Sequence, residues 1–225
     1  MGKIAFIGID PSINSTGISV RFCHKTDNND IIEDSVKFYI LKPDTKETTK
    51  TGKTKSPLSA KEIDAEKRNS DILKYLTYYK VLQKDSDSTE ERELCKTQTF
   101  IHIIDAIKQL IIETMIVTDE IYICIEGISY GSSIRTVSVF DLAGLNYLIR
   151  FTILNILNGD GTYMQIVPPT SIKKFATGKG NANKDLVIEV FNGIYGKLNI
   201  PKVDDIADAF FMSRLAQRYY EKEHL

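Results

Sequence analysis

The sequence predicts an α/β fold in which a mixed β-sheet has helices on its faces. Residues 3–41 contain three apolar runs of strand length, separated by turn residues. From about residue 90 onward, segments with apolar residues at helical spacing alternate with short apolar runs. Strands first, followed by alternating helices and strands, are typical of a mixed sheet flanked by helices.

Composition sets the outer limits of this prediction. The chain has 225 residues, enough for one domain with a full core. Its net charge of −1 means that a nucleic-acid site must be a local feature. Its three cysteines lack metal-ligand or disulfide spacing, which fits a reducing compartment. The N-terminus shows no signal-peptide pattern, so we expect a cytoplasmic protein.

The three N-terminal strands are expected at residues 3–10, 17–23 and 32–41. The first is apolar almost throughout and is expected to be buried on both faces, whereas the other two alternate more. A turn rich in Pro, Ser, Asn and Gly separates the first strand from the second.

A change in composition after the third strand predicts an insertion at about residues 42–92. Residues 42–61 are rich in Lys, Thr, Ser, Pro and Gly, and are expected to be basic and mobile. Residues 62–82 carry apolar side chains at helical spacing and predict an amphipathic helix. Residues 1–225 are therefore predicted to form a single domain that carries this insertion.

The rest of the chain predicts helices at about 90–117, 133–157, 170–176, 184–196 and 204–222, and strands at 120–126 and 162–167. The helix at 133–157 is apolar almost all round. Asp141, Asn146 and Arg150 interrupt it, so it is predicted to be a buried helix and not a membrane span. It is either a central core helix or, because its apolar side chains exceed the needs of one face, the contact surface of a dimer.

Four acidic residues are placed where predicted elements end or begin. Asp10 ends the first strand and Glu126 ends the strand at 120–126. Asp205 and Asp208 are three residues apart in the first turn of the last helix, so they share one face. Each also has an ordinary structural explanation: an Asx-turn for Asp10, a solvated strand end for Glu126, and helix capping for the last two.

Taken together, the four acids favour a metal site. Converging carboxylates repel one another, and their burial is costly unless a cation neutralises them. Oxygen ligands without nearby His or Cys are typical of magnesium, for which manganese can substitute. Two such ions about 4 Å apart can activate a water and stabilise the leaving oxygen in phosphodiester hydrolysis. We therefore expect Asp10, Glu126, Asp205 and Asp208 to be catalytic metal ligands that hold two ions.

These acids lie within motifs that resemble a known family. The segments are Gly8–Ser12 with Thr16 and Gly17, Ile125–Gly127, and Asp205–Ala209. In this order they resemble the RuvC-type Holliday-junction resolvases of the RNase H-like superfamily, especially the virus- or phage-encoded members. Residues 168–188 are similar to the segment of that family that supplies basic residues near the scissile phosphate.

The resemblance implies an RNase H-like mixed sheet flanked by helices, magnesium dependence, and a homodimer that presents two active sites to a four-way DNA junction. It implies a crossover junction endodeoxyribonuclease of DNA recombination and repair that leaves 5′-phosphate and 3′-hydroxyl ends. It assigns the metal ligands to Asp10, Glu126, Asp205 and Asp208, with Asp204 as an alternative to Asp205. The expected DNA-binding residues are Lys173, Lys174, Lys179, Lys184 and the aromatic Tyr130.

Three other functions remain open at this stage. A related RNase H-like nuclease could act on forks, flaps or RNA–DNA hybrids with the same ligands. An actin-like or sugar-kinase ATPase also has an Asp after its first strand, but here Pro11 follows Asp10 and a second glycine-rich phosphate loop is missing. A non-catalytic junction-binding module is disfavoured by the complete set of acids. The lysine cluster itself could be no more than a solvated face.

Overall fold

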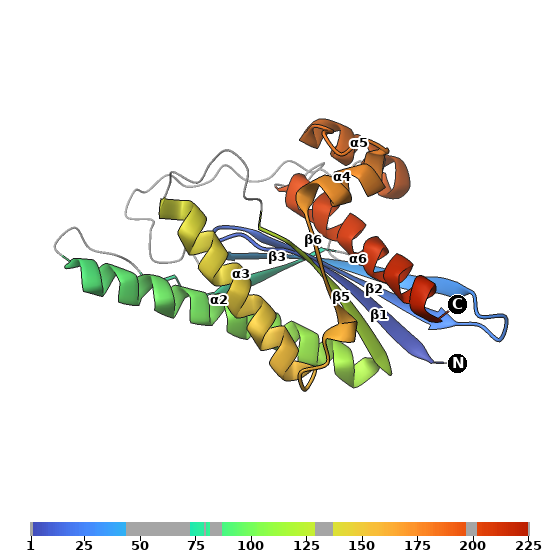
Figure 1. The fold of residues 1–225 in the computed structure, drawn as a ribbon, viewed down its shortest axis with the longest axis horizontal. Helices are drawn as coiled ribbons and strands as arrows, with labels where there is room; N and C mark the ends of the chain where they lie inside the picture. Colours follow the sequence, from blue (N-terminus) through green and yellow to red (C-terminus); the bar gives the residue numbers. More distant parts are fainter. Residues whose placement is uncertain are drawn as a thin grey trace, which may run out of the picture.

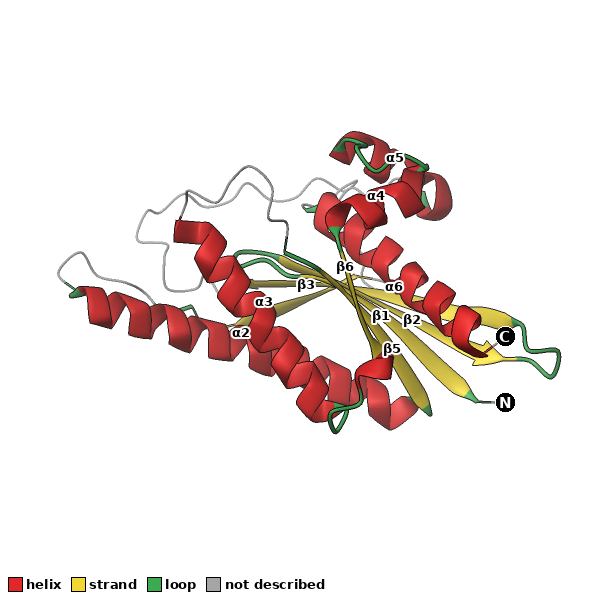
Figure 2. Ribbon diagram, in the orientation of Figure 1, coloured by secondary structure: helices red, strands yellow, loops and turns green. Residues whose placement is uncertain are grey.

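A six-stranded mixed β-sheet forms the centre of the protein, in the order β4-β3-β2-β1-β5-β6 (Figure 1). The structure is a computed structural model that describes residues 2–43, 73–78, 80–81, 87–128, 137–196 and 202–224. Helices cover both faces of the sheet, so the predicted fold class of a mixed sheet flanked by helices is confirmed (Figure 2).

The first three strands form an antiparallel meander, as expected from the sequence. They are β1 (Lys3–Asp10), β2 (Thr16–Lys25) and β3 (Ile31–Pro43). On the other side of β1, β5 (Glu120–Glu126) and β6 (Met164–Val167) continue the sheet in parallel orientation. The central position of β1 explains why its apolar run is nearly continuous: both of its faces are covered.

The described helices begin and end within a few residues of the predicted bounds. They are α2 (Thr89–Val117), α3 (Val137–Ile156), α4 (Pro169–Thr177), α5 (Lys184–Tyr195) and α6 (Val203–His224). Local sequence fixes several of these ends. Ser88 and Glu91 form a capping box at the start of α2, and the Asn183 side chain accepts a hydrogen bond from the Leu186 backbone at the start of α5.

The amphipathic helix predicted at 62–82 is wrong where the structure describes that range. Residues Leu73–Tyr78 form a strand, β4, that pairs in parallel with β3. Leu73 and Tyr78 are buried in this strand. Pairing with the edge of β3 outweighs the helical spacing of a short apolar segment, for which sequence periodicity is ambiguous. Of the segment 42–61 that was predicted to be basic and mobile, residues 44–61 lie outside the described residues, whereas Lys42 and Pro43 end β3.

Alternation along the strands assigns each side chain to one of two cores. Ile4 and Phe6 pack with α4, α5 and α6, whereas Ala5, Ile7 and Ile9 pack with α2 and α3. The same alternation places Tyr122 and Cys124 of β5 on the α6 side. Asp10 and Glu126, which continue these alternating series, therefore belong to the α6 face of the sheet.

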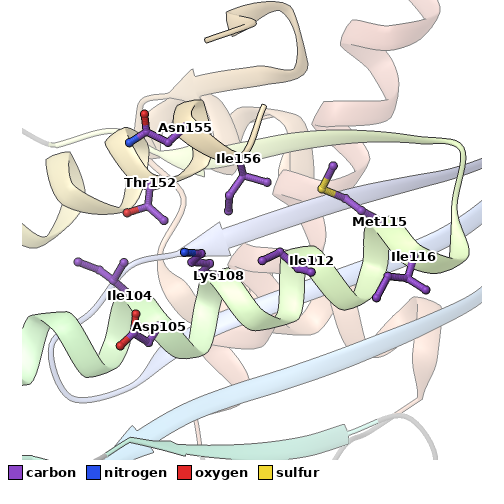
Figure 3. Close-up of a pocket in the computed structure, with 9 residues that line it drawn as sticks. All are labelled: Ile104, Asp105, Lys108, Ile112, Met115, Ile116, Thr152, Asn155 and Ile156. Carbon is purple, nitrogen blue, oxygen red and sulfur yellow. The ribbon is translucent and has the colours of Figure 1, made fainter. Parts of the chain in front are cut away.

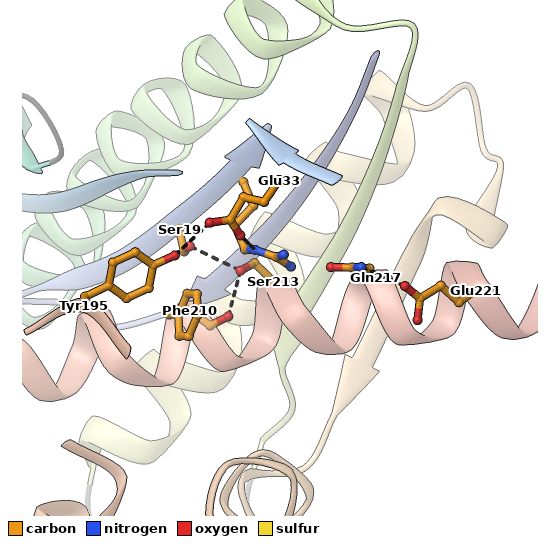
Figure 4. A network of polar contacts seen from close by, with 8 residues as sticks. Ser19, Glu33, Tyr195, Phe210, Ser213, Gln217 and Glu221 are labelled. Carbon is orange, nitrogen blue, oxygen red and sulfur yellow. Dashed lines mark hydrogen bonds and ion pairs between the residues drawn. The ribbon is translucent and has the colours of Figure 1, made fainter. Parts of the chain in front are cut away.

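Helix α6 approaches the sheet unusually closely. A Cβ atom at Gly8 would lie 1.9 Å from the Ala209 carbonyl oxygen, and one at Gly17 would lie 2.4 Å from the Asp205 carbonyl oxygen. Small polar residues continue this contact, since the hydroxyl oxygens of Ser19 and Ser213 lie 3.2 Å apart (Figure 4). The absence of side chains on two strands thus lets the first turns of α6 lie directly on the sheet.

Helix α3 is less buried than the sequence suggested. Leu145, Ile149 and Ile153 are buried against the sheet and α2, but Phe140 and Phe151 are 69% and 65% exposed. The prediction of a buried helix is therefore wrong for one face. By length and composition alone, residues 139–156 could cross a membrane, and 22% of that window is buried. That criterion is weak evidence, because core helices of soluble proteins also meet it.

Substitution of Gly8 by alanine tests the close approach of α6. The added methyl group meets helix backbone, which cannot rotate away, so we expect a loss of at least about 3 kcal/mol in the free energy of unfolding. Gly193→Ala in α5 is the matched control, because a Cβ there meets nothing within 4 Å. It should stabilise the protein by about 0.5–1 kcal/mol. Equal effects of both variants in urea denaturation would contradict the account.

Candidate active site

The register of β1 and β5 brings Asp10 and Glu126 side by side. Gly8 pairs with Cys124 and Ile9 with Ile125, so the next two residues along these parallel strands are Asp10 and Glu126. Both carboxyl groups project from the carboxyl end of the sheet onto the α6 face. The electrostatic effects on Asp10 place Asp205 and Asp208 nearby as well. The structure thus brings together all four acids that the sequence singled out.

Asp10 and Glu126 share a hydrogen bond between their carboxyl groups. Burial, followed by the charge and hydrogen bond of Glu126, raises the pKa of Asp10 well above its usual range. Burial also raises the pKa of Glu126, although the hydrogen bond from Asp10 works in the opposite direction. The two carboxyl groups therefore titrate as a coupled pair, in which Asp10 binds a proton more readily than Glu126 does.

Asp208 adds a third carboxyl group to this buried pair. Burial and the nearby Glu126 carboxylate raise its pKa to about 6, while Lys184 and Lys173 oppose the shift. Two lysines that the sequence assigned to DNA binding therefore lie within electrostatic reach of the acids. Their positive charges partly offset a cluster that is otherwise negative.

Asp204 and Asp205 differ in their partners. Asp204 forms an ion pair with Lys184 at 2.8 Å, and that lysine lowers the pKa of Asp204 against the effect of burial. Asp205 instead accepts a hydrogen bond of 2.7 Å from the Ser15 hydroxyl, and burial raises its pKa. Asp205 contributes to the pKa shift of Asp10 and of Glu126. This arrangement favours Asp205 over Asp204 as the residue that joins the acidic cluster.

Sequence reasoning missed several residues that hold the acids in place. Ser15 is buried in the β1–β2 turn and fixes Asp205, as described above. Thr16 closes that turn, since its hydroxyl donates to the Ser12 carbonyl at 2.8 Å. Asn146 of α3 donates to the Glu126 carbonyl at 2.9 Å, although the sequence showed it only as an interruption of an apolar run. The sequence feature that could have identified Ser15 is the polar composition of the β1–β2 turn.

The other predicted DNA-binding residues are less tightly connected to the acids. Lys174 and Lys179 are exposed on α4 and just after it, and neither is among the charges with the largest effects on the four carboxyl groups. Tyr130 lies outside the described residues. Lys173 and Lys184 are therefore the lysines that the described structure associates most directly with the site.

The donor chemistry of the cluster fits a hard divalent cation. Burial raises the pKa of all four carboxyl groups, repulsion between neighbouring acids adds to the shift at Asp10 and Asp208, and a bound cation would relieve that repulsion. Among the described residues, no three His, Cys, Asp or Glu side chains already stand in a metal-binding arrangement. The fit therefore rests on the type and number of ligands, and the carboxyl groups would turn when a cation binds.

Comparison with solved structures finds Holliday-junction resolvases among the similar folds. No protein-family model and no curated protein sequence matches the chain. Thermus thermophilus RuvC with a Holliday junction substrate has 16% identity and a TM-score of 0.49, over 99% of this chain and 96% of that chain. RuvC of the same organism alone has 13% identity and a TM-score of 0.46, with the same coverage. The yeast mitochondrial Holliday junction resolvase Ydc2 has 13% identity and a TM-score of 0.42, over 97% and 80%.

These structures are named as RuvC and as a Holliday junction resolvase, the group that the sequence motifs resemble. The fold of this chain is a mixed six-stranded sheet flanked by helices, as the resemblance implied. That assignment rests on the chain's own strand order and directions, with an antiparallel β3-β2-β1 meander extended by parallel β5 and β6. The additional edge strand β4 is supplied by the predicted insertion.

Asp208→Asn tests the electrostatic strain in the site. The pKa of Asp208 is about 6 in the folded protein, against an ordinary value of 3.8, so the folded protein binds more protons than the unfolded chain between these values. Stability from this group therefore falls as pH rises from about 4 to about 6. Without divalent cations, the variant should melt several degrees higher than the native chain at pH 7.5 and show little difference at pH 4. A lower melting temperature at pH 7.5 would contradict the assignment.

Proposed function

We propose that the protein is a metal-dependent, structure-specific endodeoxyribonuclease that resolves four-way DNA junctions by paired nicks, leaving 5′-phosphate and 3′-hydroxyl ends. The convergence of Asp10, Glu126, Asp205 and Asp208 on one face of the sheet is the observation that supports it most strongly. A buried cluster of carboxylates lowers stability unless cations bind to it. Metal-dependent phosphodiester hydrolysis requires such bound cations. The preference for junctions is supported by the motifs around these acids.

Each residue has a distinct part in this proposal. Divalent cations held by Asp10, Glu126, Asp205 and Asp208 would supply an activated water and charge stabilisation. Lys173 and Lys184 reduce the repulsion between the acids and an approaching phosphate, as their effect on Asp208 illustrates. Ser15 keeps Asp205 oriented through its hydrogen bond, and Asn146 keeps the end of β5 in place.

Cleavage assays with purified protein test this function. In magnesium, Asp10→Asn should slow nicking of a four-way junction by about 10³-fold or more, because it removes a group that acts on the transition state. Binding of the junction should remain, since lysines make the phosphate contacts. Asp204→Asn is the matched control from the same turn as Asp205, and its effect should be mild. Near-normal cleavage by Asp10→Asn would refute the site.

The same assay separates the proposed substrate from its alternatives. Forks, flaps, RNA–DNA hybrids and linear duplexes are compared with the junction at equal concentration. Paired, symmetric nicks that are fastest on the junction support a resolvase. Faster cleavage of a hybrid, fork or flap would point to the related nuclease function with the same acids.

We also infer that the protein acts as a homodimer. A junction has near two-fold symmetry, and two symmetric nicks need two active sites. The outer surface of α3 and α2 is the candidate interface, because Phe140, Tyr147, Phe151 and Ile116 are all more than half exposed there. Beside it, a groove of about 630 Å³ runs between the two helices, lined by apolar side chains such as Ile112 and Met115 (Figure 3).

Phe151→Asp should convert this dimer to a folded monomer at micromolar concentration. Phe151 is 65% exposed, so the change does not disrupt the core. Ile194→Asp on α5 is the matched control, because Ile194 is also an exposed apolar residue but lies on another helix. The mass of each variant is measured by light scattering. A monomeric native chain, with or without junction DNA, would exclude the dimer.

A further inference from the structure

A small basic pocket lies on the same face of the sheet as the four acids. Its volume is about 230 Å³, and it is lined by Asn14, Ser15, Ile40, Lys42, Tyr75 and Lys202. The sequence motifs did not predict this pocket. Tyr75 belongs to β4, which the sequence did not predict, and Lys202 precedes α6, outside the motifs. The pocket therefore combines the β1–β2 turn, the edge of the sheet and the start of α6.

Strand alternation explains why these side chains meet. Ile40 is in the core on the α6 side, so Lys42, two residues later on β3, faces the same side. Tyr75 pairs directly with Ile40 across the parallel β3–β4 ladder. The insertion after the third strand thus places an aromatic ring next to the site face, which gives this part of the chain a role that the motifs alone did not suggest.

The pocket is positively charged and partly aromatic. Among the described residues that line it, the ionisable cations are Lys42 and Lys202, and none carries a carboxylate. The Lys42 ammonium lies 4.1 Å from the centre of the Tyr75 ring, while Tyr75 remains 45% exposed. A cation held beside an exposed aromatic face suits a phosphate together with a sugar or base.

The pocket is continuous with the acidic cluster. Ser15 lines the pocket and also donates its hydroxyl hydrogen to Asp205 at 2.7 Å. Lys202 lies three residues before Asp205, and its charge lowers the pKa of that carboxyl group. Lys202 also has a φ of 63°, a left-handed conformation that lysine rarely adopts. A ligand in this pocket would therefore be the immediate neighbour of whatever the acids act on.

We propose that this pocket binds one nucleotide of the cleaved DNA strand next to the scissile phosphate. Lys42 and Lys202 hold its phosphate, and the exposed Tyr75 ring contacts its sugar or base. This inference rests on the proposed nuclease function and adds a strand-binding subsite to it. The pocket is smaller than the roughly 300–1,000 Å³ of sites for drug-sized ligands, so it takes one unit of a polymer and not a separate cofactor.

Salt-dependent binding tests the subsite without relying on catalysis. Binding of a fluorescent four-way junction is measured by anisotropy between 50 and about 300 mM salt, without divalent cations and in an Asp10→Asn background, for which slow cleavage is expected. Lys42→Gln and Lys202→Gln should each lower the slope of log K against log salt by about 0.7–0.9. Both lysines are exposed, so neither change should unfold the chain, which thermal unfolding verifies.

Matched controls come from the same strand. Lys74→Gln removes the same charge from β4, but Lys74 alternates with Tyr75 and faces the other side of the sheet, so its slope should not change. Tyr75→Ala should weaken binding several-fold, and Tyr75→Phe, which keeps the ring, should restore it. If Lys42→Gln and Lys202→Gln behave like Lys74→Gln, or if Tyr75→Phe is as weak as Tyr75→Ala, the subsite is wrong.

The outcomes distinguish this subsite from the nuclease proposal itself. Junction cleavage by the native chain with unaltered salt slopes in the lysine variants would remove the subsite and leave the nuclease. Reduced slopes together with full cleavage by Asp10→Asn would keep the DNA subsite and remove the catalytic assignment. A native chain that neither binds nor cleaves branched DNA would overturn both.

Discussion

The close contact between α6 and strands β1 and β2 is the constraint on which the site depends. Gly8 and Gly17 leave no side chain between helix and sheet, and the Asp205 carbonyl lies where a Cβ of Gly17 would be. Since Gly17 pairs with Asp10 across the β1–β2 ladder, this contact carries the start of α6 to the end of β1. Packing of backbone on backbone thus sets the distance between the strand acids and the helix acids.

This packing buries four carboxyl groups near one another. Because that arrangement is electrostatically unfavourable, it indicates a functional site. Burial raises the pKa of Asp10, Glu126, Asp205 and Asp208, and neighbouring acids add to the shift in each case. A cluster selected for stability alone would replace such groups with neutral ones. Hydrogen bonds from Ser15 and Asn146 hold the arrangement in place in spite of its repulsion. The cost is understandable if cations and a phosphate occupy the site during catalysis.

The sequence predicted the strands and helices that are determined by neighbouring residues. It missed the features that depend on residues far apart in the chain. The apolar runs of β1 and β5 and the helical spacing of apolar residues in α2 gave the bounds of these elements closely. Strand β4 was missed because its partner strand lies about 35 residues earlier in the chain, and six residues fit either period. Ser15 could not be linked to Asp205 from sequence, since 190 positions separate them. The excess of apolar side chains on α3 could be seen in the sequence, but which of them would be exposed could not, because that depends on how the helix packs against the sheet and α2.

We propose that a divalent cation takes the place of a proton on the Asp10–Glu126 pair. Calorimetric titration with magnesium at pH 6, repeated in buffers of different ionisation enthalpy, measures the protons released on binding. The account predicts release of a substantial fraction of a proton per site, and its loss in Asp10→Asn. Magnesium binding without proton release, or release that persists in Asp10→Asn, would contradict it.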